Sequence, residues 1–72
     1  MDETLGQRLI AMRRERGLRL ADVADAAGIS ISWLNDMEHD RNTPSLDTLV
    51  RLATAFGTTA AELLRGVPPY GA

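Results

Sequence analysis

The chain has 72 residues, 44% of them hydrophobic, and this favours one small folded domain over a disordered tail. It contains no cysteine and a single histidine, which excludes a disulfide framework and argues against a structural zinc site. No apolar run approaches the roughly 20 residues that span a bilayer, so we expect a cytoplasmic protein without membrane attachment.

The charges are unevenly distributed along the chain. The net charge is −2 and the pI about 5.1, whereas nucleic-acid-binding domains often exceed a pI of roughly 9. All eight basic residues are arginines, which suit bidentate contact with phosphate. A local positive patch is compatible with the acidic total, because several arginines crowd one early region: Arg8, Arg13, Arg14, Arg16 and Arg19.

Helix signals begin near the N-terminus. Thr4 and Gln7 form a capping-box pattern in front of an apolar face, which predicts a first helix that ends at Gly17. A second, short helix is predicted over residues 20–27 and is closed by Gly28.

The next two helices are also marked by caps. Ser30 is a good N-cap for a third helix that reaches about Glu38. Pro44 predicts a loop before Ser45, which caps a fourth helix that stops at Gly57. The apolar residues at helical spacing in this fourth helix are Leu46, Leu49, Leu52, Ala53 and Phe56.

A fifth helix closes the predicted fold. Thr59 and Glu62 repeat the capping-box pattern, and Gly66 ends the helix. Strand signals are nearly absent, so the sequence predicts an all-α, five-helix domain over residues 1–66. The remaining residues 67–72 contain two prolines and are interpreted as a tail or linker stub.

The second and third predicted helices have the pattern of a helix-turn-helix. Two helices that cross steeply over a short turn need a small residue where they approach, and Ala24 provides it. The turn needs a residue that tolerates positive φ, and Gly28 provides that. The apolar residues spaced to point inward are Val23, Ala27, Ile29, Leu34 and Met37.

From Leu5 to Leu64 the chain resembles the Cro/C1-type (XRE family, lambda repressor-like) helix-turn-helix domains of bacterial and phage repressors. The matching segments are "LGQRL", "RRERGL", "VADAAGIS", "RNTPSLDTLVRLATAFG" and "AELL". The segments "GLRLADVA", "PSLDTL" and "LLRGVPPYG" resemble, more narrowly, the N-terminal domain of DdrO-type repressors of the radiation response.

This resemblance implies a sequence-specific transcription regulator, a repressor, that binds double-stranded DNA. The helix from about Ser30 to Glu38 would read the major groove, and two copies would bind paired half-sites as a homodimer. The narrower resemblance implies a further C-terminal domain for dimerisation and cleavage by a partner metalloprotease. We expect no cofactor, and a location in the cytoplasm at the nucleoid.

The resemblance also implies roles for individual residues. An ion pair between Arg13 and Glu38 would hold the reading helix at its angle. The positions that meet bases or backbone in the family are occupied by Ser30, Ile31, Ser32, Trp33, Asn35 and Asp36. In the loop after the third helix, the backbone contacts would come from Arg41, Asn42 and Thr43.

Two of these positions allow alternative interpretations. Asp36 either accepts a hydrogen bond from cytosine N4 or is a solvated carboxylate tied to Arg41. Trp33 either shields the groove between the second and third helices or lies against sugar or a thymine methyl. Ser30 is sufficiently explained as an N-cap, and both of its roles can hold together.

The chain departs from the family pattern at two places. Leu20 stands where the family has a phosphate-binding Gln, so Arg19 and the backbone N–H groups at that helix start would replace it. Further attraction to phosphate would come from Arg41 and from Arg14 or Arg16. Asp40 replaces a common Gly, so the turn after the third helix is expected to differ in shape.

Other functions and assemblies compete with this interpretation. His39 is the sole histidine and has no nucleophile or metal set beside it, so we expect no enzyme. A protein-binding module, such as an antitoxin-like or anti-repressor domain, is the alternative on the same fold. Near the C-terminus an exposed apolar strip for dimerisation could be formed by Leu63, Leu64, Val67 and Tyr70. The plainer interpretation assigns the first two to the core and the other two to a tail.

Overall fold

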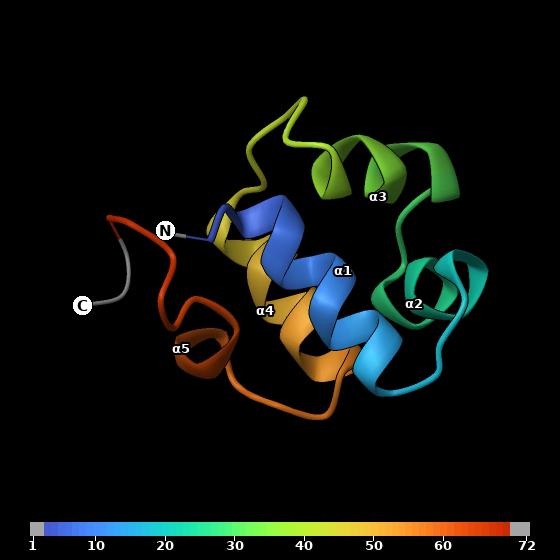
Figure 1. Cartoon of the computed structure of the whole chain (residues 1–72). Coiled ribbons are helices and arrows are strands. Elements are labelled where there is room, and N and C mark those ends of the chain that lie inside the picture. The colour runs from blue at the N-terminus through green and yellow to red at the C-terminus, as the bar shows by residue number, and fades with distance from the viewer. Residues whose placement is uncertain (1–2, 70–72) are drawn as a thin grey trace.

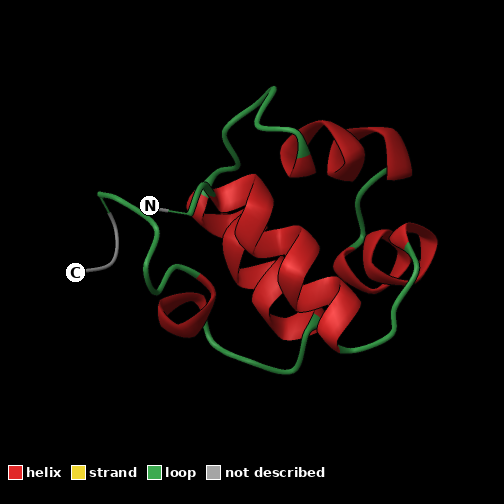
Figure 2. Ribbon diagram, viewed as in Figure 1, coloured by secondary structure: helices red, strands yellow, loops and turns green. Residues whose placement is uncertain are grey.

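Five α-helices carry the regular structure of the computed structural model, which describes residues 3–69 (Figures 1 and 2). No strand occurs within that range, and the predicted all-α, five-helix class is confirmed. In the same range no helix is long and apolar enough to cross a membrane. The helices are α1 (Leu5–Glu15), α2 (Leu20–Ala27), α3 (Ile31–Glu38), α4 (Leu46–Ala55) and α5 (Ala60–Leu63).

Four helices begin at a hydroxyl N-cap, as predicted from the sequence. In each, the capping hydroxyl accepts from the backbone N–H three residues later, and the capping residues are Thr4, Ser30, Ser45 and Thr59. At Thr4 the capping box closes, because the Thr4 N–H also donates to Gln7 Oε1 at 3.0 Å. At Thr59 only half of the predicted box forms, and the Glu62 carboxylate lies instead 3.4 Å from the Arg65 guanidinium and 3.9 Å from that of Arg8.

All five helices contribute to one hydrophobic core. The third helix packs on α1 and α2, and α4 packs on α2 and α5. Short helices are marginal in isolation, so this packing supplies most of their stability. The core side chains are Leu9, Met12, Val23, Ala24, Ala27, Leu34, Met37, Leu49, Leu52, Ala53, Phe56 and Leu63.

The apolar face predicted for the fourth helix is confirmed except at its first residue. Leu46 is 72% exposed, because it lies on the edge of the apolar stripe beside Val50, which is 48% exposed. These two side chains leave an apolar surface on the outside of α4.

The C-terminal segment is packed further than the sequence suggested. Val67, which was assigned to the tail, is 2% exposed, and its N–H donates to the Leu64 carbonyl at 3.0 Å. The packed structure therefore continues past residue 66. Because Leu63 is also fully buried, the expected exposed strip is wrong for Leu63 and Val67. Tyr70 lies outside the described residues.

Arg8 in α1 and Arg16, the residue that caps its C-terminal end, bind the C-terminal ends of other helices. Arg8 donates to the carbonyls of Leu63 and Glu62, at 3.3 and 3.0 Å. Arg16 donates to the Phe56 carbonyl at 2.8 Å and lies 5.9 Å from the centre of that ring. Such contacts satisfy carbonyls that a helix end leaves unpaired. Arg16 is therefore engaged within the fold, in contrast to the expectation that it is available to phosphate.

Candidate nucleic-acid interface

The second and third helices are joined by a turn with the predicted geometry. Gly28 has φ of 70° and ends α2 in the left-handed conformation, and the Ile29 N–H donates to the Ala24 carbonyl at 3.0 Å. A Cβ added to Gly28 would meet only an Arg51 nitrogen, at 3.8 Å. The glycine is therefore required by backbone conformation rather than by space. Ala24 is buried where the helices meet, as expected.

The third helix lies at the periphery of the fold, beside α2 (Figure 1). Its inner side is anchored by Leu34 and Met37, which are buried in the core. Its outer side exposes Ile31 at 51% and Trp33 at 41%. Ser30 and Ser32 are also exposed. The first turn of α3 thus presents a mixed apolar and hydroxyl surface to the exterior.

An ion pair joins α1 to the end of α3. Arg13 Nε and Nη2 donate to the two carboxylate oxygens of Glu38, at 2.7 and 3.0 Å. Arg13 also donates to the Leu18 carbonyl at 3.2 Å. The bond from Glu38 raises the pKa of Arg13 above its ordinary value. Because the Glu38 side chain is 3% exposed, this acid presents no free charge to the surroundings.

The start of α2 carries a second pair. The Asp22 carboxylate accepts from the Arg19 backbone N–H at 2.8 Å, and from Arg19 Nε and Nη2 at 3.1 and 3.0 Å. These bonds lower the pKa of Asp22 and raise that of Arg19. The end of α2 that was expected to receive phosphate is therefore occupied by a carboxylate of the same helix.

A third pair also lies at the C-terminal end of α3. Arg41 Nη1 donates to Asp36 Oδ1 at 3.3 Å. In the protein without DNA, Asp36 is therefore a carboxylate tied to Arg41, which is the plainer of its two interpretations. The Oδ2 atom of Asp36 accepts no hydrogen bond from residues 3–69, which leaves one carboxylate oxygen for another donor.

The expected DNA contacts fall into separate groups in space. Arg19, Ser30 and Ile31 border one cleft of about 540 Å³ between the starts of α2 and α3. The same cleft includes Asp22 and Asp25, two acids that sequence reasoning did not place there. A charge census along the chain cannot reveal this, because the cleft forms only when the two helices cross.

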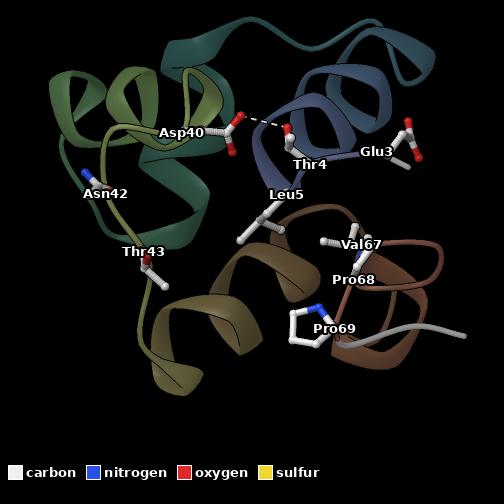
Figure 3. A pocket seen from close by; sticks show the side chains of 9 residues that line it. All are labelled: Glu3, Thr4, Leu5, Asp40, Asn42, Thr43, Val67, Pro68 and Pro69. Carbon is white, nitrogen blue, oxygen red and sulfur yellow. Dashed lines mark hydrogen bonds between the residues drawn. The ribbon is translucent and has the colours of Figure 1, made fainter. Parts of the chain in front are cut away.

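The loop residues Asn42 and Thr43 lie elsewhere. They line a cavity of about 390 Å³ together with the start of α1 and the segment 67–69 (Figure 3). The Asn42 Oδ1 atom is buried and has no hydrogen-bond partner within residues 3–69. Arg41, the first of the three loop residues predicted to contact the DNA backbone, is hydrogen-bonded to an α3 reading position, Asp36.

Comparison with known proteins places the chain in a family. Residues 4–65 match the family model described as a helix-turn-helix domain. The chain is 52% identical, over 67 residues, to the transcriptional regulator DdrOP3 of Deinococcus deserti, and this covers 93% of the chain and 52% of the relative. It thus spans about half the length of this curated relative.

Solved structures agree with this placement. The restriction-modification controller protein C.AhdI of Aeromonas hydrophila has a TM-score of 0.80 and 32% identity, covering 82% of this chain and 89% of that one. The biofilm regulator SinR, solved in complex with DNA, has a TM-score of 0.80 and 28% identity, covering 86% of this chain and 100% of that one. The chain belongs to the Cro/C1-type (XRE) helix-turn-helix family and is similar, within it, to DdrO-type regulators.

Proposed function

We propose that the chain binds double-stranded DNA as a sequence-specific transcription regulator, a repressor, and reads the major groove with α3. The observation that carries the proposal is the division of this short helix into two sides. Leu34 and Met37 fix α3 to the core, while Ile31 and Trp33 face outward. An outward, firmly held helix is what groove reading requires. The structural similarity to SinR, solved with DNA, supports the same function.

The exposed groups suit base edges and the DNA backbone. Ser32 can hydrogen-bond a base edge or a phosphate, and Ile31 can pack on a thymine methyl. Asn35 carries the amide that pairs with adenine, and Asp36 Oδ2 can accept from cytosine N4. Trp33 would add apolar contact with sugar or a thymine methyl.

Phosphate binding requires some arginines to change partners. Within residues 3–69 every arginine except Arg14 either donates a hydrogen bond to a carboxylate or carbonyl of the chain or forms an ion pair with one of its carboxylates. The pairs of Arg19 and Arg41 are exposed, at 82% and 62% for the arginine side chains. Exposed ion pairs contribute little to stability because water screens them, so exchange of a carboxylate for a phosphate costs little.

Few phosphates are neutralised in this arrangement. The logarithm of the binding constant changes with the logarithm of salt by about −0.9 per phosphate contacted, so we expect a shallow salt dependence. A single module buries only about 600–1,000 Å² of protein surface on DNA. We therefore propose a homodimer on half-sites about 34 Å apart. A location at the nucleoid follows from the same proposal, and regulation by a metalloprotease follows from the DdrO-type resemblance.

The proposal is tested by selecting duplexes from a random pool and titrating the enriched sequence at two salt concentrations. We expect one enriched motif, binding that weakens with salt, and loss of that binding in an Arg19→Ala, Ser32→Ala double variant. The matched control is Arg65→Ala with Thr54→Ala, which removes the same charge from the segment after α5 and one hydroxyl from α4. Absence of any enriched sequence, or binding indifferent to salt, contradicts the proposal and favours the protein-binding alternative.

A further inference from the structure

Asp40 occupies a backbone conformation that normally belongs to glycine. Its φ is 57°, and it is the one non-glycine residue with positive φ among residues 3–69. Its N–H donates to the Met37 carbonyl at 3.1 Å, and the Arg41 N–H donates to the Asp36 carbonyl at 2.9 Å. These two bonds form the Schellman motif that ends α3, with Asp40 at the position where glycine is the usual residue. An aspartate here accepts backbone strain that a glycine would avoid.

The side chain of Asp40 makes two bonds to the start of α1. Oδ1 accepts from the Gly6 N–H at 2.9 Å, and Oδ2 accepts from the Thr4 hydroxyl at 2.7 Å, which is drawn in Figure 3. The Gly6 N–H is among the first N–H groups of α1, which lack partners inside their own helix. The first turn of α1 contains no acidic residue, so Asp40 supplies the negative charge that suits this positive helix end.

The end of α3 lies directly against Gly6. A Cβ on Gly6 would lie 2.5 Å from the Glu38 carbonyl oxygen and 2.8 Å from that of Met37. The C-terminal end of α3 is thus tied to α1 at two places, through Asp40 at the start of α1 and through the Glu38–Arg13 pair further along it. Gly6 and Arg13 are about 10 Å apart along a helix, at 1.5 Å per residue. Two ties at this separation constrain the direction of α3 as well as its position.

We propose that Asp40 is a positioning residue for DNA reading, whose carboxylate fixes the direction of α3 relative to α1. The inference rests on the proposed function, because it concerns the helix that would enter the groove. For removal of the Asp40 carboxylate, it predicts a change in DNA affinity opposite in sign to the change that charge alone would cause. Removal of an acid beside DNA should strengthen binding by charge alone, whereas loss of positioning should weaken binding to the preferred sequence.

The test uses the 72-residue chain and the duplex enriched by selection. Asp40→Gly keeps the left-handed turn and should fold, because glycine favours that conformation. We expect its affinity for the enriched duplex to fall by about tenfold, the scale of one lost base contact, while affinity for random duplex stays equal or rises. Asp40→Asn should restore specific binding, since its amide can still accept from Gly6 and pair with Thr4.

Glu15→Gln is the charge-matched control, because Glu15 is exposed at the end of α1 and makes no side-chain hydrogen bond within residues 3–69. The positioning role is overturned if Asp40→Gly and Glu15→Gln strengthen binding to the enriched duplex alike.

A second measurement separates this inference from the proposed function. Residual dipolar couplings of the free protein report the angle between α1 and α3, and amide exchange reports the Gly6 N–H. In Asp40→Gly we expect a changed angle and faster Gly6 exchange, with both restored in Asp40→Asn. If the unmodified chain binds no duplex, the proposed function fails while these couplings still decide the role of Asp40. Unchanged couplings in Asp40→Gly would overturn it.

Discussion

Arg13 and Glu38 lie 25 positions apart in the chain and form a two-bond ion pair between α1 and the last residue of α3. With side chains exposed by 16% and 3%, both are largely removed from water. Removal of one partner from such a pair destabilises the fold more than replacement of both, because the remaining charge is buried without a partner.

Removal of the Glu38 carboxylate should therefore destabilise the domain strongly. We expect Glu38→Gln to lower the free energy of unfolding by about 3–5 kcal/mol, measured by urea denaturation followed through Trp33 fluorescence. Replacement of both partners, Arg13→Met with Glu38→Met, should recover part of the loss. A Glu38→Gln variant as stable as the parent would show that the pair does not hold α3.

The Arg19–Asp22 pair should make the stability of the fold depend on pH in the acidic range. Its bonds lower the pKa of Asp22 below the ordinary 3.8, so the pair stabilises the folded state above that pH. The stabilisation is lost as pH falls through the lowered pKa. We expect Asp22→Asn to melt at a lower temperature than the parent at about pH 7, and the difference to shrink as the pH falls below the ordinary pKa of 3.8.

Asp25 provides the control for this prediction. It lies in the same cleft, is exposed, and its side chain accepts no hydrogen bond from residues 3–69. Asp25→Asn should leave the dependence on acid unchanged. An equal response of the two variants would assign the effect to net charge rather than to the pair.

Asp36 should contribute to sequence preference through its unbonded oxygen. We expect Asp36→Ala to relax selection at one base pair and to weaken binding to the enriched duplex by about 1–3 kcal/mol. Arg41→Ala should weaken all duplexes uniformly and reduce the salt slope by about one unit. Repetition of the duplex selection with each variant measures both effects. Stronger binding of every duplex by Asp36→Ala would instead identify Asp36 as a carboxylate that only restrains Arg41.

Gly6 should resist replacement despite its place in a helix. Helix propensity alone predicts that Gly6→Ala stabilises the chain by about 1 kcal/mol. The contact of its Cβ with the Glu38 carbonyl oxygen, at 2.5 Å, predicts the opposite sign, and overpacking of this kind costs about 1–3 kcal/mol. Chemical denaturation of the variant distinguishes the two signs, and a stabilised Gly6→Ala chain would disprove the close approach.

Much of the local structure was predictable because its chemistry is local. The caps at Thr4, Ser30 and Ser45 act within three residues, and the Gly28 turn needs only the conformational freedom of one residue. The Arg13–Glu38 pair came from the family resemblance, because no rule of spacing links positions so far apart.

The tertiary contacts were not predictable, because their chemistry joins residues far apart in the sequence. Arg8 was interpreted as part of a positive patch, yet it donates to a carbonyl 55 positions away. Asp40 was expected to alter a turn, and its bonds to the start of α1 cross 34 and 36 positions. Val67 is buried although prolines follow it at once. A side chain's distant partner depends on how complete helices pack, and that packing leaves no short sequence pattern.

The commitment of most arginines to partners within the chain has a kinetic consequence. A protein slides along random DNA while many unpaired basic side chains hold it close to the phosphates of the duplex. Here most of the cations are shared with the chain's own acids and carbonyls. We expect brief visits to random sequence, a search dominated by hopping through solution, and prolonged residence only where α3 meets its preferred bases.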